Sequence, residues 1–519
     1  MAETSARFVV PALLAAGLLA RLGMASWSFL NPDEALHFLL SEQPSLRLAY
    51  QASLTTAHPP FLILLLYYWR WLGRSELVLR LPSVLAGTAF CWVMFLWLRR
   101  VRDKTTALIG LTLFLFAPSL ILLSAEIRQY SLLLFFAAGA LYFLDRALLE
   151  NSFCFMVLSG LALDFALLTH YSALIFALTI GIYALLRLRA ARVRPAVIAC
   201  WIGGQCCALA VVTFLFKTHI RLLRSEGLPQ EISDTWLRTS IFHSGREHGA
   251  VFAVRNTIRL FHYFFSQGAI GVLALLLFVV GTGWLVWRER GETANDDRPS
   301  SRQLGFLLLF PFAVNCGLAL TGIYPYGGTR HNAMLEIFAT PGISIGLACW
   351  KSSPAWLKPA GIAAALLFCN LFPNPTGAYI RPRDQHKPLM TNAVDFLRDS
   401  APPSSIVVAD NGGGLLLSYY LCHRNVVQFQ PPYQPFQESH CGNYSVITSA
   451  PVFSARVDTA ALQSIGQYYA LTPGTPVWIF EAGWIVDKEH DPAAELRQAG
   501  CPDPRMFGRN VVMCRTAIP

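Results

Sequence analysis

Two adjacent carboxylates, Asp33 and Glu34, follow directly on the first apolar segment of the chain, within the stretch NPDEALHFLL (31–40). An ionisable group placed where a membrane span emerges from lipid is costly, so such a group is a candidate for function. If residues 33–40 form a helix, Asp33 and His37 share one face and Glu34 points away from them. A purely structural interpretation is open as well, because proline and acidic residues commonly begin an interfacial helix.

Four more groups of polar side chains lie at the ends of apolar segments. They are AHPP (57–60) with His58, AEIRQYS (125–131) with Glu126, Arg128 and Tyr130, the pair His170–Tyr171, and YPYGGTRH (324–331) with Tyr324, Tyr326, Arg330 and His331 around a glycine pair that we expect to be flexible. Each group has a structural explanation of its own, since arginines extend to interfaces, a histidine can cap a hairpin and tyrosines populate interface belts.

The composition shows what must position these groups. The chain has 519 residues, of which 54% are apolar and only 14% charged. Soluble domains carry about 25% charged residues, so the chain is predicted to be a membrane protein. The net charge of +10 is then interpreted as membrane topology, with basic loops in the cytoplasm, and no nucleic-acid partner is expected.

The apolar segments predict about eleven transmembrane helices. They run near 8–30, 81–98, 105–123, 129–147, 152–169, 171–187, 195–216, 267–287, 303–322, 332–350 and 355–373. A twelfth segment, 61–73, is too short to span and contains Arg70, so we expect it to lie on the membrane surface. This count places the short basic loops, such as RRVRDK (99–104) and RLRAARVR (187–194), on the cytoplasmic side. Arg21, inside the first segment, is expected to extend towards an interface.

With that topology the five polar groups share the outer face of the membrane. Arg128 and Arg330 begin spans on the side where basic residues are disfavoured, which suggests an anionic ligand such as a lipid phosphate. A carboxylate can accept a proton from an attacking hydroxyl, while arginine and histidine side chains stabilise a departing phosphate. The combination is suited to glycosyl transfer from a lipid-phosphate sugar.

The composition changes after residue 373, so we predict a membrane domain over 1–373 and an extracytoplasmic α/β domain over 374–519. Helices are expected at 391–400 and 412–421 and strands at 404–410, 425–429 and 476–482. Four cysteines in this region, Cys422, Cys441, Cys501 and Cys514, are compatible with two disulfides. At least one pair is expected to be oxidised, with Cys501–Cys514 the first choice because these two are closest in sequence.

The sequence resembles the GT-C-fold glycosyltransferases of the protein O-mannosyltransferase and aminoarabinose-transferase type. The matching features are the Asp33–Glu34 pair after the first span, the HPP of His58–Pro60, RLPSVLAG (80–87) and AEIRQYS (125–131), with YPYGGTRH (324–331) like a motif in bacterial relatives. Relatives often carry an acid shortly before HPP, whereas Thr55–Thr56–Ala57 stand here, so the second carboxylate is either Glu126 or absent.

The resemblance implies a polytopic α-helical GT-C-like membrane enzyme that uses a polyprenyl-phosphate sugar on the outer face and inverts the anomeric centre. It implies Asp33 as the general base, and we expect Glu34 to support it. The expected substrate-binding residues are His37, His58, Glu126, Arg128, Tyr130, His170, Tyr326, Arg330 and His331.

The expected partners are the lipid-linked donor, membrane lipid, and a glycan, lipid or protein acceptor, in the inner (plasma) membrane with the active site and C-terminal domain on the periplasmic side. No cofactor is expected. Asp33 and His37 are spaced to hold a divalent metal, but no third ligand is specified. The alternative function is a lipid or polysaccharide transporter or flippase, although such proteins usually place ionisable groups near mid-membrane and often show repeated halves.

Overall fold

The computed structural model of the chain describes residues 2–190, 193–222, 237–265, 268–288, 298–349, 359–364, 366, 385–422, 436–449, 457–482, 492–498 and 500–519. The chain forms two compact units. The first contains Met1–Ala25, Thr56–Leu62 and Arg80–Arg381, and the second contains Ser26–Thr55, Ile63–Leu79 and Pro382–Pro519. The predicted boundary at 373/374 falls outside the described residues and stays a prediction.

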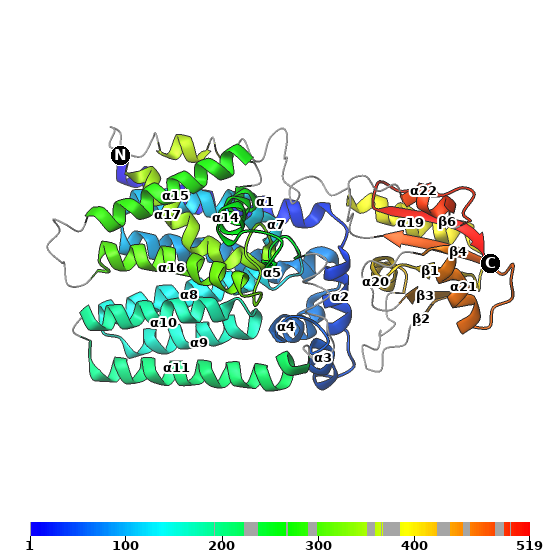
Figure 1. Cartoon of the computed structure of the whole chain (residues 1–519), viewed down its shortest axis with the longest axis horizontal. Helices are drawn as coiled ribbons and strands as arrows, with labels where there is room; N and C mark the ends of the chain where they lie inside the picture. Colours follow the sequence, from blue (N-terminus) through cyan, green and yellow to red (C-terminus); the bar gives the residue numbers. More distant parts are fainter. Residues whose placement is uncertain are drawn as a thin grey trace. The chain divides into compact units, whose positions relative to one another are not determined.

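The first unit is a bundle of apolar helices (Figure 1). In chain order its helices, including the ends of α1 and α5 that belong to the second unit, are α1 (Ala2–Trp27), α5 (Glu76–Val101), α6 (Lys104–Phe116), α7 (Pro118–Ser124), α8 (Tyr130–Glu150), α9 (Phe153–Thr169), α10 (Ala173–Ala190), α11 (Pro195–Leu215), the π-helix η2 (Phe216–Ile220), α14 (Gly249–Phe265), α15 (Gly268–Arg288), α16 (Ser301–Leu320), the 3₁₀-helix η3 (Arg330–Leu335) and α17 (Glu336–Ala348).

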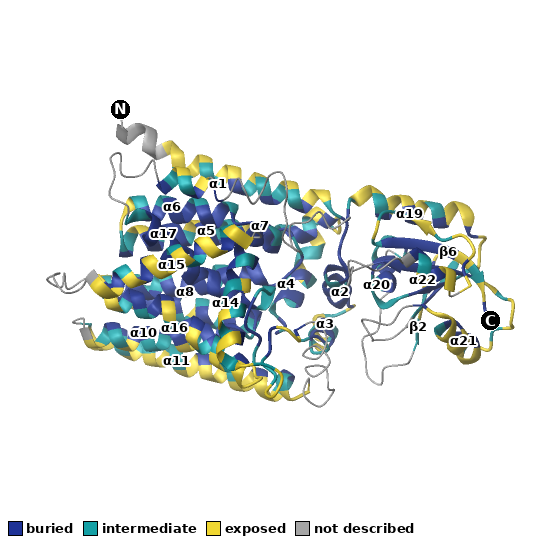
Figure 2. Ribbon diagram, turned by 45° about the horizontal axis from the view of Figure 1, so that its top comes forward, coloured by how far each residue is buried: buried dark blue, intermediate teal, exposed yellow. Residues whose placement is uncertain are grey.

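The outer helices expose apolar side chains. Figure 2 shows exposed residues along α1 and α11, whereas α5 and α8 are mostly buried. Leu19 on α1 and Leu209 on α11 are each 67% exposed. An apolar surface of this kind is suited to lipid, so the chain is a multi-pass membrane protein, as its composition predicts.

Within the described residues, six helices are long and apolar enough to cross a membrane, or seven if the bent pair α6–α7 is one span. Ten of the eleven predicted segments, from 8–30 to 332–350, coincide with helices, and the eleventh is described only at 359–364 and 366. The polytopic helical fold class is therefore confirmed, while the count of eleven stays a prediction. Segment 61–73 forms the short helices α4 (Phe61–Trp69) and η1 (Arg70–Leu72).

The prediction for Arg21 is wrong, because its side chain is fully buried and does not reach an interface. Helix α6 ends where Pro118, which has no N–H, begins α7, and the two helices are bent by 56°. This break leaves carbonyls of the last turn of α6 without helical partners. The Arg21 guanidinium donates to two of them, Phe114 O at 3.1 Å and Leu115 O at 2.8 Å, and to Ser124 Oγ on α7 at 3.2 Å.

Two further close contacts hold the bundle together. Gly281 of α15 packs directly on α17, where an added Cβ would lie 2.0 Å from Gly342 O. Small residues allow such close helix approach in membranes. Asp145 of α8 is buried with Arg187 of α10 at 3.7 Å, and it also accepts hydrogen bonds from Trp97 Nε1 and Tyr183 OH. The buried carboxylate is thus satisfied by three neighbours.

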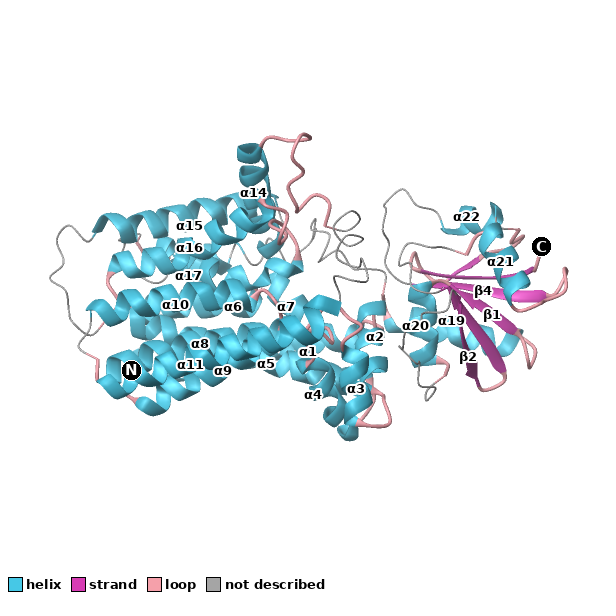
Figure 3. Ribbon diagram, turned by 60° about the horizontal axis from the view of Figure 1, so that its bottom comes forward, coloured by secondary structure: helices cyan, strands magenta, loops and turns pink. Residues whose placement is uncertain are grey.

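The second unit contains a six-stranded sheet with helices around it, shown in magenta in Figure 3. Its elements are α2 (Pro32–Ser41), α3 (Leu46–Ser53), most of α4, η1, α19 (Lys387–Ser400), β1 (Ile406–Ala409), α20 (Asn411–Tyr420), β2 (Phe436–Cys441), β3 (Tyr444–Ser449), α21 (Thr459–Tyr468), β4 (Pro476–Ala482), α22 (Pro492–Gln498), β5 (Arg505–Met506) and β6 (Val511–Ala517). The strand order is β2-β3-β1-β4-β6-β5, with β1 parallel to β3 and β4 and the other pairs antiparallel.

The α/β prediction for the C-terminal region is confirmed. The predicted elements at 391–400, 404–410, 412–421 and 476–482 correspond to α19, β1, α20 and β4, while 425–429 lies outside the described residues. The pairs Cys422–Cys441 and Cys501–Cys514 both form disulfides. The expectation of at least one oxidised pair is therefore confirmed, and the first choice, Cys501–Cys514, is one of the two.

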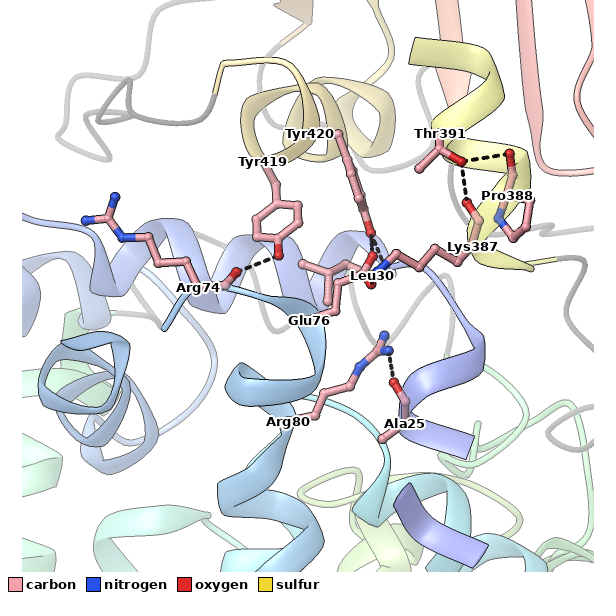
Figure 4. Close-up of polar contacts among 10 residues, drawn as sticks. All are labelled: Ala25, Leu30, Arg74, Glu76, Arg80, Lys387, Pro388, Thr391, Tyr419 and Tyr420. Atoms are coloured by element: carbon pink, nitrogen blue, oxygen red, sulfur yellow. Dashed lines mark hydrogen bonds and ion pairs between the residues drawn. The ribbon is translucent and has the colours of Figure 1, made fainter. Parts of the chain in front are cut away.

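The first loop packs on the C-terminal elements within this unit (Figure 4). The Tyr420 hydroxyl accepts from Leu30 N–H at 2.8 Å and donates to the Glu76 carboxylate, which also pairs with Lys387 Nζ at 2.6 Å. The Tyr419 hydroxyl donates to Arg74 O at 2.7 Å. Helix α2, which carries Asp33, is therefore fixed to α20 rather than being a mobile membrane loop.

The Arg21 contacts predict a large effect on stability. Replacing Arg21 with methionine keeps an apolar stem but leaves the carbonyls at the α6–α7 break unsatisfied, at a cost of about 1–3 kcal/mol for each lost partner. We expect Arg21→Met to lower the thermal denaturation midpoint of the detergent-solubilised protein by several degrees. Arg100→Met is the matched control, because Arg100 pairs with Glu150 at a partly exposed site where ion pairs contribute little. Equal midpoints for the two variants would contradict this role of Arg21.

Candidate active site

Four of the five polar groups predicted from the sequence meet in the first unit. The ring centroids of His58 and His170 are 5.4 Å apart, and that of His170 lies 5.2 Å from Tyr130 and 6.3 Å from His331. The Arg128 guanidinium carbon is 5.7 Å from the centre of the Tyr130 ring. We call His58, Arg128, Tyr130, His170, Arg330 and His331 the His/Arg cluster.

The electrostatics of the cluster favour an anion. Burial, together with the positive charges of Arg128 and Arg330, lowers the pKa of His170 to about 3. His170 is therefore neutral at ordinary pH, and its Nδ1 interacts with Ser172 Oγ at 2.8 Å. Two guanidinium groups close enough to act on one buried imidazole create a local positive potential, which is suited to binding a phosphate.

The turn that carries Arg128 is held from two sides. The Ser83 hydroxyl of α5 donates to Arg128 O at 3.0 Å. The Ser131 hydroxyl of α8 donates to Leu123 O at 3.1 Å and contacts Ser124 Oγ at 3.2 Å, and Ser124 in turn accepts from Arg21. The position of Arg128 thus depends on the same buried polar contacts that close the α6–α7 break.

The loop that carries Arg330 and His331 is also tightly held, and the expectation of a flexible glycine pair is wrong. A Cβ added at Gly327 would lie 2.7 Å from Asn256 Oδ1, and one at Gly328 would lie 2.6 Å from Arg259 O, both on α14. Gly327 has φ +135°, a conformation that side chains disfavour. Asn332 Nδ2 donates to Gly327 O at 3.0 Å. The glycines allow close packing rather than motion.

Two of the predicted residues, Tyr326 and Glu126, take part in contacts that support the local fold. Tyr326 is 2% exposed, and its hydroxyl lies 2.8 Å from Thr257 Oγ1 on α14, so in this structure it anchors the loop. Glu126 is half-buried, and its carbonyl accepts from Arg128 N–H at 2.8 Å. A sugar contact by Tyr326 and a substrate contact by Glu126 stay predictions.

The remaining predicted residues belong to the second unit, on α2. Asn31 and Glu34 form a reciprocal capping box, in which Glu34 Oε2 accepts from Asn31 N–H at 2.9 Å and Asn31 Oδ1 accepts from Glu34 N–H at 3.0 Å. Glu34 is buried, whereas Asp33 is half-exposed. His37 Nδ1 bonds the backbone oxygen of Asp33 one turn earlier. The carboxylate of Glu34 therefore caps the N-terminus of α2. The carboxylate of Asp33 is the more accessible of the two.

One residue of the first unit was missed from the sequence. His219 is fully buried on the π-helix η2; its Nε2 bonds Thr56 O at 2.7 Å, and its Nδ1 bonds the Tyr171 hydroxyl. It thus links the chain just before His58 to the residue after His170. A lone histidine at the end of an apolar helix gives no signal of this role, and π-helices of this kind occur often at functional sites.

A comparison with known proteins matches the part of the chain that contains most of these residues. Residues 57–216, which include His58, Arg128, Tyr130 and His170, match the family model described as Dolichyl-phosphate-mannose-protein mannosyltransferase. The structure of ArnT from Cupriavidus metallidurans in the apo state has a TM-score of 0.55 at 13% identity, over 98% of both chains. ArnT bound to undecaprenyl phosphate gives 0.55 at 14% identity, over 98% of this chain and 97% of that one. No curated protein sequence matches the chain.

The chain has the GT-C fold, and its family-model match over residues 57–216 indicates glycosyltransferase activity. At this level of identity the solved structures establish the fold alone, and the family model, which matches less than a third of the chain, supports the enzyme class. The model covers most of the His/Arg cluster, while Asp33, Arg330 and His331 lie outside the matched range. Among the described residues, no group of three His, Cys, Asp or Glu side chains is arranged to hold a metal ion, and the expectation of no cofactor stays a prediction.

The lowered pKa of His170 makes the stability of the transferase sensitive to acid. Between pH about 6.5, where an unfolded histidine protonates, and pH about 3, the unfolded state binds one proton more than the folded state. This histidine should therefore cost up to about 1.4 kcal/mol of stability per pH unit as the pH falls through that window. When the pH falls from about 7.5 to about 5, the thermal denaturation midpoint of His170→Gln should fall by less than that of the wild type.

The matched control is His248→Gln, because His248 is exposed in the same unit. Denaturation midpoints of the wild type and both variants at the two pH values give the comparison. If His170→Gln and the wild type lose the same amount on acidification, His170 is not held neutral by its surroundings.

Proposed function

We propose that the transferase moves a sugar from a polyprenyl-phosphate donor to an acceptor hydroxyl at the outer, periplasmic face of the inner membrane, with inversion. The observation that carries the proposal is the His/Arg cluster, in which Arg128 and Arg330 act on the buried, neutral His170, and Tyr130 lies beside Arg128 and His170. The ArnT structure with undecaprenyl phosphate supports a lipid-phosphate donor, since the two chains share a fold.

The chemistry assigns a role to each group. Asp33 accepts the proton of the acceptor hydroxyl, whose oxygen forms the new bond to the anomeric carbon. The bond from that carbon to the phosphate oxygen breaks, and the lipid phosphate leaves with the electron pair. Arg128 and Arg330 neutralise the charge that develops on this leaving group. His331 and His58 are proposed to contact the phosphate as well.

The assignment of Asp33 rests on the resemblance and on its accessibility. Of the two adjacent carboxylates, Glu34 is buried and caps α2, whereas Asp33 is half-exposed. Glu34 and His37 are proposed to position Asp33 through the first turn of the helix. A direct role for Glu34 in proton transfer is a weaker proposal, because its carboxylate already accepts the Asn31 N–H.

Kinetics of the purified enzyme test these roles. Asp33→Asn keeps the size and polarity of the side chain but cannot accept the proton, so turnover should fall about 10²–10⁴-fold with donor binding retained. Turnover is measured with a panel of undecaprenyl-phosphate hexoses and pentoses in nanodiscs. Asp395→Asn is the control, because Asp395 is exposed on α19. An Asp33→Asn enzyme with normal turnover would remove the base assignment.

Arg330→Ala should instead weaken donor binding as well as turnover, because it removes a charge-assisted contact. Binding is measured with undecaprenyl phosphate itself, and Arg246→Ala serves as the control because Arg246 is exposed in the same unit. If Arg330→Ala binds the lipid phosphate as tightly as the control does, the phosphate is held elsewhere.

The alternative, a transporter or flippase, makes a different prediction. A transporter moves the lipid without breaking the sugar–phosphate bond, so no free undecaprenyl phosphate accumulates. Release of that product by the wild type, and its loss in Asp33→Asn, supports the transferase; lipid movement without bond cleavage supports the alternative.

A further inference from the structure

The sheet of the second unit has an incompletely covered edge. On one side, β6 pairs with β4 over Val511–Ala517. On its other side, β5 pairs only with Val512 and Met513. Among the strands of the described residues, none therefore pairs with 514–517 on that side. An unpaired strand edge presents N–H and C=O groups that can accept another extended chain.

The alternation along β6 identifies the groups that face the open side. Phe507 N–H on the β5 side donates to Val511 O at 2.8 Å, whereas Ile518 N–H donates to Thr475 O at 2.9 Å on the β4 side. Since the direction alternates with each residue, the backbone N–H and C=O of Arg515 and Ala517 point to the open side. Arg515 and Ala517 are both exposed.

A groove of about 900 Å³ lies along this edge, lined among others by Phe396, Trp478, Asp503, Arg505 and Arg515. The Arg505 guanidinium carbon is 4.1 Å from the centre of the Phe396 ring, whose centroid is 6.0 Å from that of Trp478. Arg515 lies opposite Trp478 in the β4–β6 register. Two arginines against one aspartate give this groove a positive wall.

Part of the groove lining is fixed by covalent and hydrogen-bonded contacts. Cys501 is linked to Cys514 of β6, and the Thr516 hydroxyl donates to Gly500 O at 2.9 Å. These contacts hold the segment before β5 against β6. A groove that is already formed does not have to be ordered on binding, which lowers the entropic cost of taking up a ligand.

We propose that an extended, acidic polypeptide segment binds in this groove by adding a strand to the free edge of β6. Only an extended polypeptide offers donors and acceptors at the two-residue repeat of about 6.8 Å that Arg515 and Ala517 present. Acidic side chains at alternate positions of such a segment face Arg505 and Arg515. The proposal concerns the second unit alone and does not depend on the transferase assignment.

The test uses the full-length chain in nanodiscs and a fluorescein-labelled peptide of alternating valine and glutamate. Fluorescence anisotropy should show saturable binding, weaker for a valine–lysine peptide and for a peptide with proline at alternate positions, which lacks the required N–H groups. Hydrogen exchange resolved to single residues should show slower exchange at Arg515 and Ala517 on binding. The Thr516 amide should not change, because it already faces β4.

Paired substitutions separate the contribution of the backbone hydrogen bonds to peptide binding from that of the side-chain charges. Ala517→Pro removes the edge N–H and should weaken the peptide about tenfold, whereas Ala517→Val keeps the N–H and should not. Arg515→Glu should likewise weaken it about tenfold, whereas Arg398→Glu, on the exposed face of α19, should not. Thermal denaturation verifies that each variant is folded.

The proposal is overturned by an absence of saturable binding, by equal binding of the proline peptide, or by unchanged exchange at Arg515 and Ala517. It is also overturned if maltohexaose, an uncharged oligosaccharide, displaces the peptide, because the groove would then be a saccharide site.

Discussion

The break between α6 and α7 is the constraint on which the first unit depends. Inside a membrane every backbone polar group must find a partner in the protein, so a broken helix is possible only where other groups take up its free carbonyls. Arg21 meets this need from α1 by bonding Phe114 O, Leu115 O and Ser124 Oγ. A buried arginine, which would otherwise be unfavourable, becomes the centre of a network that joins α1, α6 and α7, and through Ser124 and Ser131 also α8.

The same network positions part of the His/Arg cluster. Helix α7 leads into the turn that carries Arg128 and Tyr130, and this turn is fixed by Ser83 and Ser131. Across the bundle, the loop 324–331 is fixed by the close approach of Gly327 and Gly328 to α14. Two rigid supports therefore bring cationic side chains to His170, and the resulting positive potential is available before any ligand binds. An anion that enters does not have to organise the site.

Much of this arrangement could be predicted from the sequence, because a polar residue in an apolar chain is conspicuous. His58, Arg128, Tyr130, His170 and His331 were all identified by type and by position at span ends, and the structure brings them together. What failed depends on contacts between distant segments. The burial of Arg21 follows from a helix break about a hundred residues later, and the role of His219 follows from a π-helix that local propensity does not specify. The glycine pair was misjudged because tight packing and flexibility favour the same residue.

The most direct test of the account is to determine which lipid binds at the His/Arg cluster, where we propose that a lipid phosphate is held. Native mass spectrometry of the protein purified in mild detergent, after incubation with equal amounts of undecaprenyl phosphate and phosphatidylglycerol, reports both bound masses at once. The account predicts preferential binding of undecaprenyl phosphate, and loss of that preference in an Arg128→Ala, Arg330→Ala double variant. Equal binding of the two lipids, or a preference that survives the double substitution, would contradict it.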